Sequence, residues 1–246
     1  MSKPRSGSFA DILARLEGTV SPHEIDTPPV VEAVRAFRDR LAGVTNAGRS
    51  GDDRDLYVLL DRVIEAVKAT YPGSLCQAGC SGCCESHVAV FDASETEWRL
   101  IEAHLETWSE AEVAALADRF SRDHAPHVRA YRLLGAVRHF EPVADRYFER
   151  HPYRCPFLVE GRCSIYAVRP LACRMYGHFA IRARWYAKPS VYACNDQTAY
   201  YHGLREARPL TLPTVNMLAG RMRRLFRGRA RILPLWLDRW LAKRRV

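Results

Sequence analysis

Apolar residues recur at three- and four-residue intervals along much of the chain, which is the pattern of amphipathic helices. The pattern is clearest over residues 56–67, where the apolar side chains fall on one face, and it is also present over 33–41. The segment AGRSGDD at 47–53 separates these two stretches as a turn or short loop, and Tyr-Pro-Gly at 71–73 ends the second helix. We therefore predict that residues 1–70 form an N-terminal helical region.

Further helices are predicted by capping boxes, in which a serine and a glutamate three residues later bond each other's backbone amides. The two pairs are Ser94 with Glu97 and Ser109 with Glu112. Helical periodicity continues over 130–148 with an interruption near Pro142, whereas residues 87–91 alternate as a short strand. These patterns predict a helical insertion at about 93–150.

Eight cysteines fall in two groups, and they are the main chemical signal of the chain. The first group lies within nine residues and consists of Cys76, Cys80, Cys83 and Cys84; the second consists of Cys155, Cys163, Cys173 and Cys194. Thiolates this close repel one another unless a cation lies among them. We therefore predict that all eight ligate zinc or iron, with a 4Fe–4S cluster as one form of the iron. Each group alone supplies the four sulfurs of a tetrahedral site, or the two groups share sulfurs.

Residues 152–176, around three of these cysteines, contain prolines and a glycine that interrupt any helical pattern. The predicted fold class is mainly α: a helical domain around an irregular, loop-rich, cysteine-ligated metal centre, with few short strands. Three regions follow in order. They are the N-terminal helices at 1–70, a cysteine-cluster metal-binding domain at 71–205 that contains the helical insertion, and a basic amphipathic C-terminal tail at 206–246.

Cys83 and Cys84 are not expected to ligate the same metal together, because the side chains of neighbouring residues diverge. One of the two ligates a second metal, bridges two metals or stays unligated, and Cys84 is expected to tolerate replacement best. Arginines crowd the second group: Arg154, Arg162, Arg169 and Arg174. They are either solvated loop residues or cations that offset thiolate charge or hold an anionic ligand. His178 is an additional candidate ligand, or a hydrogen-bond donor to one, whereas His124 and His127 are expected in a surface turn.

A disulfide framework is the competing interpretation of the cysteines, and it needs an oxidising compartment. Residues 1–20 have a basic start but lack the apolar core and small-residue cleavage site of a secretory signal. No stretch approaches the roughly 18 to 20 apolar residues of a membrane span. We therefore expect a cytoplasmic protein, in which thiols stay reduced and bind metal rather than form disulfides.

The net charge of +9 comes wholly from the end of the chain. Residues 221–246 contain ten lysines and arginines and one acid, so the rest of the chain is neutral overall. The apolar residues that follow Pro234 suit a helix at an anionic membrane surface, which would make the protein peripheral. They are Leu235, Trp236, Leu237, Trp240 and Leu241. The same face alternatively docks on the protein's own core or on a protein partner. Nucleic acid is a less favoured partner, because no recognisable nucleic-acid-binding motif accompanies the basic residues.

The two cysteine motifs together resemble a known family. Residues 76–84, CQAGCSGCC, and residues 155–176, CPFLVEGRCSIYAVRPLACRMY, are similar to the motifs of the CxxCxxCC proteins, a zinc- or iron-chelating family also called YkgJ-type cysteine cluster proteins. The first gap departs from the family pattern, with three residues between Cys76 and Cys80 rather than two. The resemblance extends over residues 76–194 and implies metal binding.

Two enzyme interpretations follow from similar motifs. Some relatives, the flagellin lysine methylases, look like iron–sulfur proteins that transfer a methyl group to protein lysines, and this alternative brings S-adenosylmethionine as a further cofactor. The spacing of Cys76, Cys80 and Cys83 also matches the motif of radical S-adenosylmethionine enzymes. Gly82 stands where those enzymes commonly have an aromatic residue, and no alternation of strands and helices follows, so we disfavour that class.

Overall fold

The computed structural model describes residues 28–85, 91–136, 146–148, 150–181, 190–191, 193–207, 212–213 and 225–244. The chain divides into two compact units, each built from stretches that are distant in sequence. Unit 1 comprises the described residues of Ala78–Pro170 and Arg227–Val246. Unit 2 comprises those of Ala10–Gln77 and Leu171–Phe226. The three regions expected from the sequence stay a prediction.

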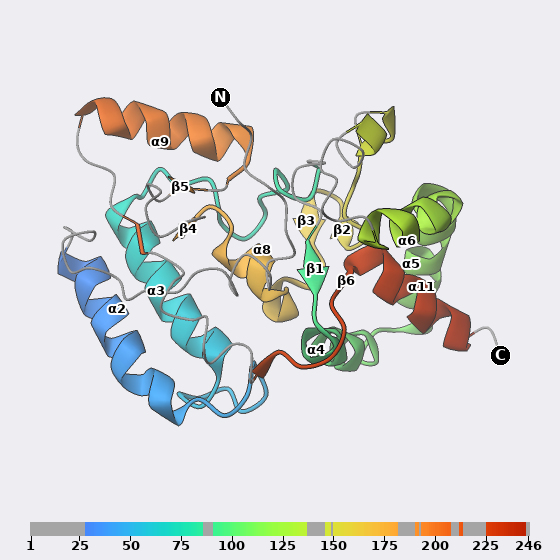
Figure 1. The fold of residues 1–246 in the computed structure, drawn as a ribbon, viewed down its shortest axis with the longest axis horizontal. Coiled ribbons are helices and arrows are strands. Elements are labelled where there is room, and N and C mark those ends of the chain that lie inside the picture. The colour runs from blue at the N-terminus through green and yellow to red at the C-terminus, as the bar shows by residue number, and fades with distance from the viewer. Residues whose placement is uncertain are drawn as a thin grey trace. The chain divides into compact units, whose positions relative to one another are not determined.

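Unit 2 is centred on the helix α3 (Leu56–Thr70), which packs against α2 (Pro28–Arg40) (Figure 1). Burial of one face of α3, including Leu60 and Val67, explains why its apolar residues are spaced as they are. Both helices predicted for this region are confirmed. The other elements of unit 2 are η2 (Leu41–Gly43), α8 (Leu171–Met175), α9 (Asn195–Ala207) and the antiparallel pair of β4 (Ala180–Ile181) and β5 (Ser190–Val191).

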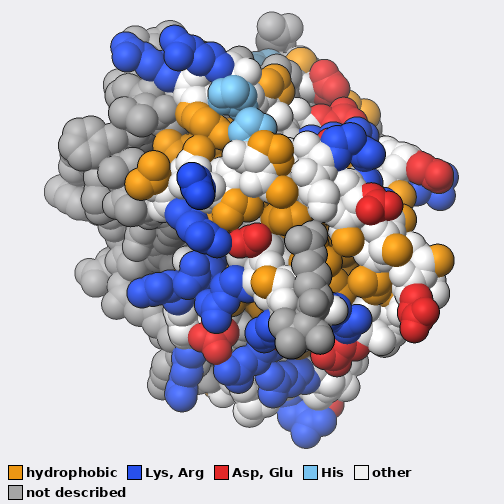
Figure 2. Space-filling view, turned by 90° about the vertical axis from the view of Figure 1, so that its right-hand side faces the viewer, with side chains coloured by type: hydrophobic (Ala, Val, Ile, Leu, Met, Phe, Trp, Pro, Cys, Tyr) orange, Lys and Arg blue, Asp and Glu red, His pale blue; other side chains and the backbone are white. Residues whose placement is uncertain are grey.

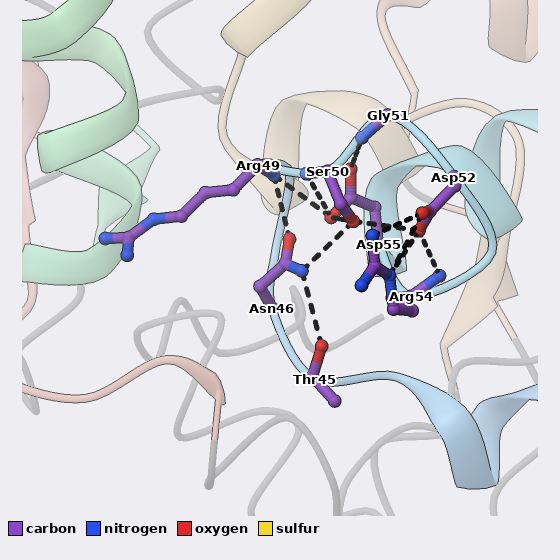
Figure 3. A network of polar contacts seen from close by, with 8 residues as sticks. All are labelled: Thr45, Asn46, Arg49, Ser50, Gly51, Asp52, Arg54 and Asp55. Carbon is purple, nitrogen blue, oxygen red and sulfur yellow. Dashed lines mark hydrogen bonds and ion pairs between the residues drawn. The ribbon is translucent and has the colours of Figure 1, made fainter.

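One buried carboxylate holds the loop before α3 (Figure 3). The Asp55 side chain accepts hydrogen bonds from the backbone N–H groups of Arg49, Ser50 and Gly51 and from the Ser50 hydroxyl. Burial alone raises the pKa of Asp55, but together these hydrogen bonds bring it below the ordinary value. The turn predicted at 47–53 is therefore confirmed, and it fixes the start of α3.

Unit 1 packs helices around one apolar core. They are α4 (Glu95–Leu105), α5 (Glu110–Asp123), α6 (Val128–Ala136) and α11 (Leu233–Arg244). Both predicted capping boxes are present, at the starts of α4 and α5. The shorter elements are η4 (Ala125–His127), η5 (Tyr166–Val168) and two antiparallel strand pairs. In these, β1 (Asp92–Ala93) pairs with β6 (Arg231–Ile232), and β2 (Leu158–Val159) pairs with β3 (Arg162–Cys163).

The C-terminal helix α11 is part of the core of unit 1. Trp236 and Trp240 are no more than 5% exposed. The Trp236 indole N–H donates to the Ala93 carbonyl at 2.8 Å, and its ring stacks on Trp98 of α4 with 5.8 Å between the ring centres. The alternative in which this face docks on the protein's own core is therefore confirmed. The expectation that these tryptophans lie at membrane headgroups is wrong, because the core of unit 1 already covers them.

Residues 152–176 contain only a two-stranded hairpin, η5 and the short helix α8, which confirms that no regular helix spans them. The strand predicted at 87–91 falls largely on residues 86–90, and part of the helical pattern at 130–148 falls on 137–145; both segments lie outside the described residues. The mainly α fold class is confirmed. None of the helices in the described part of the chain has the length and apolar character needed to cross a bilayer.

Candidate metal centre

A tight turn brings two neighbouring thiols to the same side of the chain. The Cys84 amide donates to the Ser81 carbonyl at 2.8 Å, and the Glu85 amide donates to the same oxygen at 3.1 Å. Within this turn the sulfurs of Cys83 and Cys84 are 4.0 Å apart. The expectation that these two side chains diverge is therefore wrong, because the turn curls the backbone around them.

Two cysteines of the second motif join this pair in unit 1. The Cys155 amide donates to the Cys84 carbonyl at 2.7 Å, and the Cys155 side chain lies close enough to raise the pKa of Cys84. The Leu158 amide donates to the Cys155 carbonyl at 3.1 Å. In the hairpin of β2 and β3, Leu158 is also the strand partner of Cys163, so the hairpin brings Cys163 back toward Cys155. We call Cys83, Cys84, Cys155 and Cys163 the unit 1 thiol group. It draws sulfurs from both motifs, as one of the two arrangements predicted from the sequence requires.

The unit 1 thiol group is half-buried, and the pKa values of three of its members are raised. Hydrogen bonding to Cys84, followed by burial, raises the pKa of Cys83. Hydrogen bonding to Cys155 raises the pKa of Cys84, and burial raises that of Cys163. A bound cation removes this penalty because it stabilises the thiolates directly. The group therefore suits a positively charged ligand.

One of the arginines near the second motif lies beside these thiols. Arg169 is buried, with its guanidinium carbon 3.8 Å from the centre of the Tyr166 ring. Its charge acts to lower the pKa values of Cys83 and Cys163, although thiol hydrogen bonding and burial outweigh it. Arg169 therefore has one of the two roles predicted for these arginines, that of a cation that offsets thiolate charge.

The other arginines have different surroundings. Arg174, in unit 2, is 4% exposed and donates to both carboxylate oxygens of Asp61, at 2.6 and 2.7 Å. Its guanidinium also lies 4.2 Å from the centre of the Tyr57 ring. Arg154 and Arg162 have exposed side chains in unit 1. Arg174 thus anchors α8 to α3, whereas Arg154, in a loop, and Arg162, on strand β3, are exposed to solvent.

The thiols of unit 1 are close to the spacing that a tetrahedral metal needs. With metal–sulfur bonds of about 2.3 Å, two thiolates of a tetrahedral zinc site lie about 3.8 Å apart. The 4.0 Å between Cys83 and Cys84 is near that value. Across the described ranges, no group of three or more His, Cys, Asp or Glu side chains is arranged to hold a metal ion as it stands. The group thus fits a metal in ligand type and in the Cys83–Cys84 spacing, and Cys155 and Cys163 would have to move closer.

The remaining cysteines are divided between the units. Cys80 is half-buried in unit 1 and follows Gly79, which has a φ of 97°. The other three, Cys76, Cys173 and Cys194, belong to unit 2, and Cys194 is buried directly before α9. The sulfur of Cys76 lies against Gly177, where a Cβ atom would collide with it. Glycine is needed there for a second reason, because its φ of 78° is unfavourable for other residues.

Unit 2 also contains a polar network that sequence reasoning missed. The Gln197 side chain, fully buried, accepts from the Leu75 amide at 2.7 Å and donates to the Ser74 hydroxyl at 3.0 Å. One turn later on α9, the Tyr201 hydroxyl donates to the Gly177 carbonyl at 2.6 Å. These bonds fix the backbone next to Cys76. The available signal was the four-residue spacing of Gln197 and Tyr201, which places both on one face of a helix.

The two histidine expectations had different outcomes. His178 is 3% exposed in unit 2, and its role as a ligand or a donor stays a prediction. His124 is also 3% exposed, with its Nδ1 atom 3.4 Å from the Tyr131 hydroxyl and its ring stacked on Phe120. The expected surface turn is therefore wrong for His124, because aromatic rings of unit 1 pack around it.

Comparison with known proteins identifies the family. Residues 75–196 match the CxxCxxCC family model, described as "Putative zinc- or iron-chelating domain". The matched region contains all eight cysteines and belongs to that family, which confirms the resemblance seen in the two motifs. No curated protein and no solved structure matches the chain.

Proposed function

We propose, from the membership of residues 75–196 in the CxxCxxCC family, that the protein binds zinc or iron through cysteine thiolates. The observation that carries this proposal is the unit 1 thiol group, in which sulfurs from two motifs distant in sequence lie together. We assign its four members to one centre. The other cysteines, Cys76, Cys80, Cys173 and Cys194, are proposed as further ligands.

Each part of the site has a definable role in holding the metal. The turn after Ser81 sets the spacing of the Cys83 and Cys84 sulfurs, and the hydrogen bond between the Cys155 amide and the Cys84 carbonyl joins the two motifs. Arg169 supplies positive charge where four thiolates around one divalent ion leave an excess of negative charge. A bound metal would supply the charge that stabilises the thiolates, and its binding free energy would add to the stability of the fold.

Zinc and a 4Fe–4S cluster both accept four cysteine thiolates, so the ligand type does not separate them. A structural zinc ion would make the protein a binding or assembly module. A cluster would favour the iron–sulfur enzyme interpretation, with S-adenosylmethionine as an added cofactor. Either form needs reduced thiols, as all eight cysteines are in the structure, and the cytoplasm that we propose as the location keeps them reduced.

The deciding experiment is anaerobic purification of the full chain, followed by metal analysis and a visible absorption spectrum. We expect at least one zinc or iron per chain, and thiolate-to-iron absorption would identify a cluster. Cys84→Ser should lose the metal, although the sequence alone predicted that it would be tolerated. Arg162→Gln, an exposed change next to Cys163, is the matched control and should retain it. A chain without zinc or iron, or full metal content in Cys84→Ser and Cys155→Ser, would refute this centre.

A further inference from the structure

Unit 1 contains a basic cavity of about 380 Å³ between α4 and the segment of β6 and α11. Its cationic lining residues are Arg99, Arg229, Arg231, Arg239 and Lys243. Figure 2 turns the side of the molecule that carries α11 toward the viewer, and Lys and Arg side chains gather on part of that face. The rest of the lining consists of three tryptophans and two glutamates. The cavity thus combines a concentrated positive charge with a size in the lower range of ligand sites, which begins at about 300 Å³.

The backbone fixes the first basic residues of this segment against α4. The Arg227 amide donates to the Thr96 hydroxyl at 3.2 Å, and Arg231 pairs with Ala93 in the two-stranded sheet. Between them Gly228 adopts a φ of 85° and passes so close to Glu95 that a Cβ atom would lie 2.5 Å from that carboxylate. Arg229 and Arg231 are therefore held in place by the backbone before any ligand arrives.

The acids of the cavity are already engaged by two of its cations. Glu95 bonds to Arg99 at 2.7 Å, and Glu102 lies 3.6 Å from Lys243. Within the lining, which the structure describes in full, no third carboxylate faces Arg229, Arg231 and Arg239. These three guanidinium groups give the cavity an excess of positive charge.

Arg231 is the cation most affected by this arrangement. Its Nε atom is buried and has no hydrogen-bond partner in the described part of the chain. Burial, then the charges of Arg239, Arg229 and Arg132, lowers the pKa of Arg231. Trp236 positions it, with the guanidinium carbons of Arg231 and Arg239 at 5.5 and 5.9 Å from the centre of its ring. An anion placed among these groups would relieve their mutual repulsion and supply the missing acceptor.

We propose that this cavity binds a ligand that carries a phosphate group, held by Arg229, Arg231 and Arg239. Guanidinium groups present paired N–H donors that match phosphate oxygens, and three of them converge on one cavity. The tryptophans are almost fully buried, so they support the arginines rather than offer a free face for an aromatic ring to stack on. Recognition therefore depends on the phosphate group, whether it belongs to a soluble phosphate or to a lipid headgroup.

The test is calorimetric titration of pyrophosphate into the full-length protein at physiological ionic strength, where charge attraction beyond about 8 Å is screened. Arg239→Gln and Arg229→Gln change exposed side chains and should leave the fold intact. Each should weaken binding about tenfold, because each removes charged hydrogen bonds. Arg122→Gln is the matched control: it makes the same charge change on the exposed surface of α5, outside the cavity, and should bind as the unmodified protein does.

Vesicles of phosphatidylcholine with and without phosphatidate identify the source of the phosphate. Pyrophosphate binding that depends on Arg239 supports a soluble ligand. Phosphatidate-dependent vesicle binding that depends on Arg239, without pyrophosphate binding, supports a lipid headgroup. The proposal fails if neither probe binds, or if Arg122→Gln weakens binding as much as Arg239→Gln does, since the effect would then reflect net charge alone. Metal analysis of the same samples tests the thiol centre independently, because metal content does not depend on whether the cavity binds phosphate.

Discussion

The thiols of unit 1 lie against one another, whereas the best-defined thiol of unit 2 lies against backbone that a polar network holds. In unit 1, Cys83 and Cys84 are 4.0 Å apart, and hydrogen bonding to Cys84 raises the pKa of Cys83. In unit 2, Cys76 rests on Gly177, which is fixed by Tyr201. Cysteines of one and the same motif therefore lie in different physical settings. We expect unit 1 to depend on a metal for its stability, and unit 2 to depend more on hydrogen bonds and apolar packing.

The largest effect is expected from removing one thiol in each unit. Cys163→Ser should abolish metal binding in unit 1 and cost about 3 kcal/mol or more of stability, because structural metal sites contribute about 10 kcal/mol or more to folding. Cys194→Ser removes a buried thiol of unit 2 and should have a smaller effect on both quantities. Metal analysis and thermal unfolding of both variants measure this difference. Equal losses in the two variants would remove the distinction between the units.

Acid should destabilise unit 1 through His124. Burial, together with the charge of His127, lowers the pKa of His124 from about 6.5 to about 4, although Asp123 acts in the opposite direction. The unfolded chain therefore binds the proton more readily, and stability should fall as the pH drops from about 6.5 to about 4, by up to about 3 kcal/mol. Urea unfolding across this range measures the loss. His124→Phe keeps an aromatic ring beside Phe120 and should flatten this part of the pH profile. An unchanged profile would show that His124 does not titrate on unfolding.

A smaller effect is expected where Cys76 meets the backbone of unit 2. Gly177→Ala adds a Cβ atom that collides with the Cys76 sulfur at a φ of 78°, and should cost about 2 kcal/mol. Gly203→Ala, on α9 with open space around it, is the matched control and should be neutral or slightly stabilising. Thermal unfolding measures both, and metal analysis of Gly177→Ala shows whether displacing the Cys76 thiol affects binding. Equal melting temperatures would mean that the Cys76 contact is easily relieved.

The smallest effect is expected from the ion pair that joins α8 to α3. Asp61→Asn leaves the buried Arg174 without its carboxylate, but Asp61 is itself half-exposed, so the cost should be only about 1 kcal/mol. Glu65→Gln, one turn along α3, breaks a more exposed pair with Lys68 and should cost less. Chemical denaturation compares the two, and metal content should be unchanged in both. Loss of metal in Asp61→Asn would show that Arg174 supports the thiols after all.

The sequence predicted best what depends on neighbouring residues. The helix α3 follows from its apolar spacing, and the two capping boxes each need only a serine and a glutamate three residues apart. The sequence also singled out cysteine as the proposed type of metal ligand, because eight cysteines in two motifs leave few other uses for the thiols.

What the sequence did not predict depends on contacts between distant residues. The bond between Cys155 and Cys84 joins different motifs, and no local spacing encodes it. Arg169 and Arg174 are five residues apart, yet one lies beside thiols and the other pairs with Asp61. The tail was similarly ambiguous, because an apolar helix face can pack on a membrane or on a protein core. The structure shows the partner of this face, which includes Trp98 of α4.

The contacts that hold α11 in the core of unit 1 can form only late in the synthesis of the chain. The Ala93 carbonyl is synthesised 143 residues before the Trp236 indole that binds it. Translation therefore delivers α4, α5 and all four members of the unit 1 thiol group while the core of that unit still lacks its last helix. Cys155 and Cys163 pack against the same core as α11, so this core is incomplete beside them during that interval. A metal delivered to the nascent chain would meet an open site, and the arrival of α11 would then close the unit around it.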